Sequence, residues 1–298
     1  MNQRSWWSSL PEQIDPTFIT IGGENILTFG SSSGGGFPVQ YYGLMYILVF
    51  LTTYALIGQL QKKEELSISP KQWEDIFFYG ILGVILGGRL GYVLFYNFSY
   101  YATSPGEIFM PFRNGSFVGI SGMSYHGGLI GAAVAIYYYT KRNNLSFHTI
   151  SNNLAYAFPL GYTWGRLGNF INGELYGRVT DSPLGMYFPA AEGDHLRHPS
   201  QLYEAFFEGV FLFGVLHLFR KTNRFKEKML PLYLIGYGLA RFSIEFLREP
   251  DPHIGMNILN LSRGQTLSGA MILFGSILLF WYNRRQGTPL PTSSRRTT

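Results

Sequence analysis

The stretch YYGLMYILVFLTTYALIGQ, residues 41–59, is apolar, contains no charged residue and is long enough to cross a lipid bilayer as one helix. Two further charge-free segments have apolar cores at residues 127–140 and 264–283. Only 14% of the 298 residues are charged, against about 25% in ordinary soluble proteins. The sequence therefore predicts a protein whose main solvent is lipid.

Four other apolar segments have the length of a span, but each contains a charged residue or a proline. They are residues 73–97, 150–168, 201–219 and 230–247. Together with the three clean segments they predict an all-α integral membrane protein with about seven transmembrane helices. We find no internal repeat.

Basic residues predict the orientation of these spans. Fourteen of the 23 Lys and Arg residues lie in one set of alternate connections and the C-terminal tail, six lie in the other set, and three lie in or beside spans. Because cytoplasmic loops carry the excess of basic residues, the N-terminus is predicted outside and the C-terminus inside. The net charge of +5 thus reflects topology, and we expect no nucleic-acid partner.

The segments between the spans differ in character. Residues 1–40 are predicted to be an external or interfacial segment in which Trp6 and Trp7 favour the membrane interface and residues 30–36 form a flexible loop. External segments within the membrane domain (residues 41–283) form an arm at about 99–124 and a small head at about 169–200. Residues 284–298 are a basic cytoplasmic tail, predicted to be disordered from Gly287 onward.

Ionisable residues inside spans mark candidate functional sites because burying a charge in lipid is costly. Helical rise and the predicted orientation place all of them in the outer half of the bilayer. They are Tyr42, Arg89, His126, Arg166, Glu204, Arg241 and Glu245. Nothing comparable marks the inner half.

Spacing connects the residues of the sixth span, because Tyr237, Arg241, Glu245 and Arg248 fall on one helical stripe. An Arg241–Glu245 pair that neutralises itself is one interpretation. Arg89 and Arg166 add positive charge at a similar depth, which favours an external anion such as a phospholipid phosphate. Arginine suits phosphate because its planar fork donates two parallel hydrogen bonds.

His126 opens the third span, and its imidazole is either a general base or a helix-start residue beside packing glycines. His195 and His198 are expected to have structural roles in the head. The six histidines lack metal-ligand spacing, and the absence of cysteine excludes a thiol nucleophile, a disulfide scaffold and cysteine-ligated metals.

Six blocks of the sequence resemble the prolipoprotein diacylglyceryl transferase family of bacteria, in that family's order over roughly residues 38–283. The longest is GRLGNFINGELYG, residues 165–177. The others are YYGLMY (41–46), GGRLGYVLFYN (87–97), HGGLIG (126–131), RHPSQLYEA (197–205) and YGLARFSIEFLREPD (237–251). Two departures are Tyr176, where the family pattern has Trp, and a longer N-terminal extension rich in Gly and Ser.

This resemblance implies a seven-helix enzyme of the bacterial inner membrane, with a periplasmic N-terminus, a cytoplasmic C-terminus and an active site facing the periplasmic leaflet. The implied reaction moves the diacylglyceryl group of phosphatidylglycerol to the lipobox cysteine of a preprolipoprotein signal peptide and releases glycerol 1-phosphate. No metal or organic cofactor is implied.

The resemblance also implies roles for individual residues. Arg166 and Arg241 match positions that contact phosphatidylglycerol, and His126 matches an essential or nearly essential histidine, our candidate base. Other matched positions of functional importance are Tyr42, Asn169, Glu174, Gly177, Glu245 and Arg248. Arg89 and Tyr237 join the candidate substrate-binding set because of their position in the spans.

Two other classes of protein fit less well. A rhomboid-type serine protease would use Ser121 and His126, but these are only five residues apart, and no second histidine lies at a suitable depth. A transporter for an anionic substrate would place polar residues at the midplane or repeat its halves. A structural scaffold does not explain arginines buried in a membrane.

Overall fold

The computed structural model describes residues 5–22, 27–30, 37–63, 66–110, 112–113, 116–117, 122–249 and 261–286. Contacts divide the chain into two compact units, residues 1–57 with 151–298 and residues 58–150. Helices dominate both units, as predicted for a helical membrane protein. The structure is consistent with the predicted all-α membrane protein, and it adds five short strands before the first long helix and in the arm.

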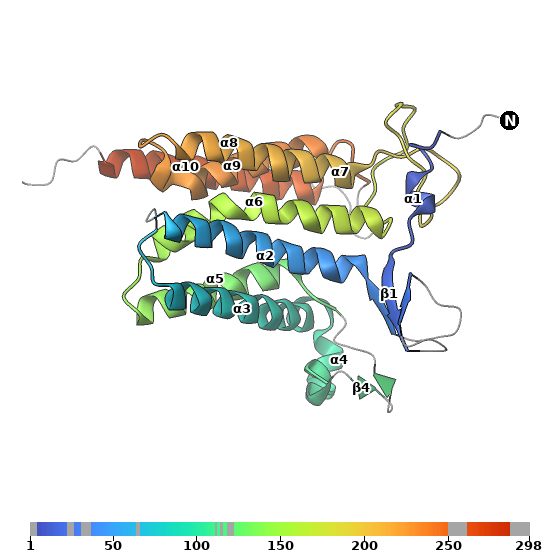
Figure 1. Ribbon diagram of the computed structural model, residues 1–298, viewed down its shortest axis with the longest axis horizontal. Coiled ribbons are helices and arrows are strands. Elements are labelled where there is room, and N and C mark those ends of the chain that lie inside the picture. The colour runs from blue at the N-terminus through green and yellow to red at the C-terminus, as the bar shows by residue number, and fades with distance from the viewer. Residues whose placement is uncertain are drawn as a thin grey trace, which may run out of the picture. The chain divides into compact units, whose positions relative to one another are not determined.

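The larger unit holds all or most of α2, α6, α9 and α10, together with one continuous helix made of α7, η2 and α8. The bounds are α2 Tyr41–Lys62, α6 Phe147–Ile171, α7 Ser200–Glu204, η2 Ala205–Phe211, α8 Leu212–Arg220, η3 Lys226–Lys228, α9 Met229–Ile244 and α10 Arg263–Gln286. Helix α9 packs against α8 and α10, and the three run side by side in Figure 1. The segment η2 is a π-helix, a feature common at functional sites.

A small antiparallel sheet precedes α2. After the short helix α1 (Leu10–Gln13), the strands β1 (Thr17–Ile21), β2 (Leu27–Phe29) and β3 (Phe37–Gln40) pair in the order β2-β1-β3. Strand β3 runs into α2 with no residue between them. Of the predicted flexible loop only Gly30 is described, with a φ of 81° that glycine readily adopts.

The head between α6 and α7 is irregular and packs around its own apolar cluster. Phe170, Met186 and Phe188 are buried, and Trp7 and Leu10 from the N-terminal segment pack against them. Trp7 also donates a 3.3 Å hydrogen bond from Nε1 to the Leu184 carbonyl. The N-terminal segment therefore supplies part of the head's core, whereas neighbouring Trp6 is 73% exposed.

In the smaller unit, α3 (Pro70–Tyr96) packs along α5 (Tyr125–Arg142), and Figure 1 shows them as neighbouring helices. Glycines allow the two backbones to meet, because a Cβ at Gly131 would lie against the Gly83 carbonyl and 2.8 Å from the Gly87 Cα. The arm follows α3 and contains α4 (Phe98–Thr103), η1 (Pro105–Ile108), β4 (Phe112–Arg113) and β5 (Ser116–Phe117). The glycines of the HGGLIG block thus serve close helix packing.

We expect Gly131→Ala to destabilise the smaller unit by about 1–3 kcal/mol, because the added methyl overlaps the α3 backbone. Gly43→Ala in α2 is the matched control, since nothing lies within 4 Å of its Cβ position and alanine favours a helix. Thermal unfolding in detergent compares the two variants. Equal stability of both would contradict the close packing of α3 and α5.

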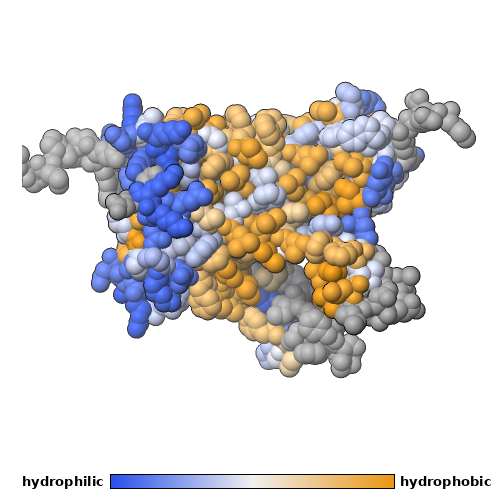
Figure 2. Space-filling model, in the orientation of Figure 1, coloured by the Kyte–Doolittle hydropathy of each residue, from blue (hydrophilic) through white to orange (hydrophobic). Residues whose placement is uncertain are grey.

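Helices occupy all seven predicted span positions, and four of them are long and apolar enough to cross a membrane by length and composition. These four are Tyr41–Lys62, Pro70–Tyr96, Ser200–Arg220 and Arg263–Arg284. In Figure 2, hydrophobic residues cover the visible sides of the larger unit's helices, and hydrophilic residues gather at the helix ends. The membrane character is confirmed, whereas the count of seven spans and the orientation of the termini stay predictions.

Candidate functional site

The carboxylate of Glu204, at the end of α7, is the centre of an ionic cluster in the larger unit. Its side chain is fully buried, and one turn later Glu208 in η2 is fully buried as well. Glu204 Oε2 lies 2.9 Å from Arg166 Nε, and Glu204 Oε1 lies 2.5 Å from Arg241 Nη1. Arginines from α6 and α9 therefore converge on a single carboxylate.

The predicted stripe of the sixth span supplies the second side of this cluster. Arg241 Nη2 lies 2.7 Å from Glu245 Oε2, one helical turn away. Arg248, just beyond α9, lies 3.8 Å from Glu204 and 3.9 Å from Glu245. Glu245 also accepts a 2.8 Å hydrogen bond from the Ser262 hydroxyl. The proposed Arg241–Glu245 pair exists, but it belongs to a larger network.

Helix α6 fixes the remaining arginine by several contacts. Arg166 Nε donates to the Tyr162 hydroxyl at 2.5 Å, and the guanidinium lies 4.8 Å from the centre of the Tyr162 ring. Arg166 Nη1 donates to Asn169 Oδ1 at 3.2 Å, and Asn169 in turn donates to Glu174 at 2.8 Å. Tyr162 donates its own proton to Glu208 at 2.6 Å. Tyr162 and Asn169, both on α6, thus hold the Arg166 guanidinium.

The charges of this cluster balance one another, which differs from the surplus of positive charge expected from the sequence. Arg166, Arg241 and Arg248 formally balance the carboxylates of Glu204, Glu208 and Glu245, so the cluster itself carries no surplus positive charge. Buried charges need such partners because desolvation costs several kcal/mol per ion. The side chains of the three arginines nevertheless stay 11–17% exposed, whereas Glu204 has no exposure at all. Each arginine side chain of the cluster therefore keeps some exposed surface, whereas the central carboxylate keeps none.

Three other predicted residues surround the cluster in the same unit. The Tyr42 ring packs 3.2 Å from the Cβ position of Gly168, and its hydroxyl lies 3.0 Å from that of Tyr46. The Tyr237 ring meets the Tyr162 ring edge to face at 5.8 Å. Gly177 pairs with Arg248 in an antiparallel bridge.

Gly177 has a steric role in the larger unit. A Cβ at this position would press against the Leu247 carbonyl and lie 2.7 Å from the His198 Cβ. The backbone amide of Gly177 also donates to the His198 carbonyl at 2.8 Å. The chain segments that meet at Gly177 therefore cannot move apart without losing hydrogen bonds. The glycine lets the head meet the chain that carries Arg248.

We expect Gly177→Ala to destabilise this junction by about 1–3 kcal/mol and to increase protease cleavage in the head. Gly214→Ala in α8 is the control, because nothing lies within 4 Å of its Cβ position. Limited proteolysis followed by peptide mass analysis measures the difference. Identical cleavage of both variants would show that the junction tolerates a side chain.

Two of the predicted site residues, Arg89 and His126, belong to the smaller unit. Arg89 is 3% exposed and donates to the Ile108 carbonyl at 2.5 Å and to the Tyr101 hydroxyl at 3.0 Å, so its guanidinium fixes the arm. A substrate contact of Arg89 stays a prediction. His126 is exposed in the first turn of α5, with its ring 5.6 Å from that of Tyr125. Ser121, which the protease alternative requires, lies outside the described residues.

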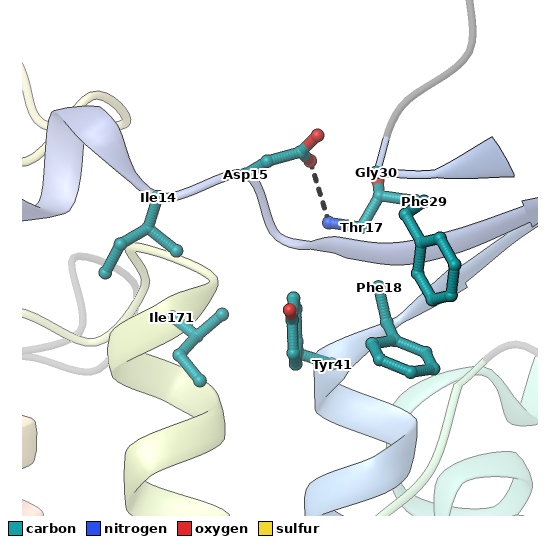
Figure 3. Close-up of a pocket in the computed structure, with 8 residues that line it drawn as sticks. All are labelled: Ile14, Asp15, Thr17, Phe18, Phe29, Gly30, Tyr41 and Ile171. Carbon is teal, nitrogen blue, oxygen red and sulfur yellow. Dashed lines mark hydrogen bonds between the residues drawn. The ribbon is translucent and has the colours of Figure 1, made fainter.

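Sequence reasoning missed the central position of Glu204 and the burial of Glu208. Both were visible as carboxylates one helical turn apart within an apolar span, which is the signal that identified Arg241 and Glu245. No three His, Asp or Glu side chains among the described residues are placed to hold a metal ion. An open pocket of about 550 Å³ lies beside the start of α2. Figure 3 shows its lining side chains, among them Asp15, Phe18 and Tyr41.

Comparison with known proteins gives consistent results over nearly the whole chain. The model of the family described as prolipoprotein diacylglyceryl transferase matches residues 31–281. A phosphatidylglycerol–prolipoprotein diacylglyceryl transferase of Chlorobaculum tepidum is 46% identical over 285 residues, 94% of each chain. Proteins of the same name from Photobacterium profundum and Idiomarina loihiensis are each 44% identical, over 92% and 82% of this chain and 95% and 89% of their own lengths.

Proposed function

The chain belongs to the prolipoprotein diacylglyceryl transferase family, and we propose on this basis that it transfers the diacylglyceryl group of phosphatidylglycerol to the cysteine thiol of a prolipoprotein. The single observation that carries the proposal is the convergence of Arg166 and Arg241, from separate helices, on one buried carboxylate. Their side chains are 17% and 11% exposed, and in this proposal their guanidiniums offer planar sets of donors to a phosphate at the edge of the cluster.

In the proposed reaction the thiolate of the peptide attacks C3 of the diacylglyceryl group. A C–S bond forms, the bond between C3 and the phosphate oxygen breaks, and glycerol 1-phosphate leaves with the electron pair. Negative charge therefore grows on the phosphate, and Arg166 and Arg241 stabilise it more in the transition state than in the bound lipid. Glu245 supports this step by holding Arg241 at 2.7 Å.

Other residues of the larger unit take supporting roles in the proposal. Asn169 and Glu174 hold the Arg166 guanidinium through their 3.2 Å and 2.8 Å hydrogen bonds. Tyr42 and Tyr237 line the approach to α6, and Arg248 supplies a third cation. We propose seven spans with the N-terminus in the periplasm, which puts this cluster in the periplasmic leaflet of the inner membrane.

The reaction needs a base, because the thiolate is the nucleophile and free cysteine has a pKa of about 8.5. His126 is our candidate, since its exposed imidazole can take the thiol proton.

We expect His126→Asn to lower the transfer rate at pH 7 by about 10²–10⁴-fold, the usual contribution of a general base. The rate of this variant should rise as the pH passes the thiol's own pKa of about 8.5, because hydroxide then removes the proton. The measurement is the transfer rate against pH, with the exposed head residue changed in His195→Asn as the control. Near-normal activity of His126→Asn at neutral pH would assign proton removal to another group.

Incubating the purified protein with phosphatidylglycerol and a lipobox peptide tests the function itself. We expect the peptide to gain the mass of one diacylglyceryl group by mass spectrometry, and a peptide with serine in place of the cysteine to gain none. A modified serine peptide, or an unmodified cysteine peptide with folded protein, would overturn the proposal.

A further inference from the structure

The small sheet before α2 has an unusual distribution of apolar side chains. The register places Ile21 opposite both Leu27 and Phe37, and Ile19 opposite both Phe29 and Val39. Because side chains two residues apart share a face of a strand, these two rows form a single face. All six residues of this apolar sheet face are hydrophobic: Ile19, Ile21, Leu27, Phe29, Phe37 and Val39.

The apolar sheet face is the more open one, although Pro38 on the opposite face is exposed as well. Phe29 is 80% exposed and Leu27 and Phe37 are each 59% exposed, whereas Thr20 on the opposite face is 3% exposed. Thr20 donates to the Gly30 carbonyl at 2.8 Å, and Thr28 is its cross-strand partner. A water-facing antiparallel sheet shows the reverse pattern, with polar residues outside and apolar residues within. The sheet therefore matches an apolar solvent on its open face.

The connection of the sheet to α2 indicates that the apolar surroundings of its open face are the lipid bilayer. Strand β3 ends at Gln40 and the membrane-spanning candidate α2 begins at Tyr41, so the sheet sits where α2 enters the bilayer. The Tyr41 amide donates to the Pro16 carbonyl at 3.0 Å, and the Phe18 and Tyr41 rings meet edge to face at 5.3 Å. Figure 3 shows the Phe18 and Tyr41 side chains beside the start of α2. These contacts fix the start of β1 to the start of α2.

We propose that the apolar sheet face rests in the lipid of the bilayer interface, as a direct continuation of the lipid-facing surface of α2. None of the residues of the three strands is charged, so no ion has to be desolvated when the face enters the headgroup and upper acyl region. Aromatic rings such as Phe29 and Phe37 add apolar area there. The proposal depends on the membrane character of α2 and is independent of the transfer reaction.

The absence of cysteine allows a direct test with single introduced thiols. Phe29→Cys reports the apolar sheet face, Leu51→Cys reports an exposed position within α2, and Asp181→Cys reports an exposed position in the head. Each full-length variant is labelled with a small environment-sensitive fluorophore and placed in vesicles of phosphatidylethanolamine and phosphatidylglycerol. Nitroxide-bearing lipids and aqueous iodide then serve as the two quenchers.

We expect the label in Phe29→Cys to lose fluorescence to nitroxide lipids as the label in Leu51→Cys does, and to resist iodide. The label in Asp181→Cys should respond to iodide alone. Quenching of the Phe29→Cys label by iodide to the extent seen for Asp181→Cys would overturn the proposal, because the face would then lie in water. Resistance to both quenchers would also overturn it, since the face would then be covered by a second copy of the chain or another protein.

Phe37→Cys gives an independent reading from β3 if the label at β2 disturbs folding. Since quenching needs no turnover, a variant that fails to transfer lipid can still report its position. The transfer assay and the quenching experiment therefore give separate results, and a negative result in one does not imply a negative result in the other.

Discussion

Replacing Arg166 with lysine is expected to lower diacylglyceryl transfer by about 10²–10³-fold while the protein stays folded. Lysine keeps the positive charge that Glu204 needs, so the buried carboxylate retains a counterion. It loses the planar fork that reaches Tyr162 and Asn169, and with it the two parallel donors for a phosphate. The effect should therefore appear in the rate and not in the stability.

The measurement is the initial rate of thioether formation, with thermal unfolding of the same preparation. Arg142→Lys at the end of α5 is the matched control, because this arginine is exposed and should tolerate the change. Near-normal transfer by Arg166→Lys would remove Arg166 from the proposed mechanism.

Glu204→Gln is expected to lower the free energy of unfolding by about 3–5 kcal/mol, the cost of breaking a buried ion pair by removing one partner. Glutamine has nearly the same shape, so the loss reports charge and not packing. The guanidiniums of Arg166 and Arg241, 2.9 Å and 2.5 Å from this carboxylate, would lose their common anchor. Transfer should fall as well, because both arginines are then free to turn away from the phosphate.

Denaturant unfolding in detergent measures this loss. Glu249→Gln is the control, because Glu249 is 46% exposed, so solvent screens its 3.1 Å pair with Arg197 and the loss should be about 1 kcal/mol or less. If the two glutamine variants proved equally stable, Glu204 would not be the anchor of the cluster.

The sequence predicted those features that depend on local spacing. Charge-free gaps located the long helices, and four-residue spacing located the Arg241–Glu245 contact. These features follow from helical periodicity alone.

Features that depend on contacts between distant segments were not predicted. The ion pairs of Glu204 with Arg166 and Arg241 require α6, α7 and α9 to meet, which no spacing within one helix reveals. The hydrogen bonds from Arg89 to carbonyls of η1 likewise arise because the chain folds back after α3. The strands β1, β2 and β3 are three to five residues long, too short for alternation to distinguish them from an interfacial coil.

The central claim is that Arg166 and Arg241 act on the departing phosphate in the transition state more than on the bound lipid. The most direct test compares the amount of phosphatidylglycerol bound to Arg166→Lys with its single-turnover rate once loaded with lipid. We expect the amount of bound lipid to change little and the rate per bound lipid to fall by about 10²–10³-fold. A normal rate per bound lipid, with the whole loss in binding, would contradict it.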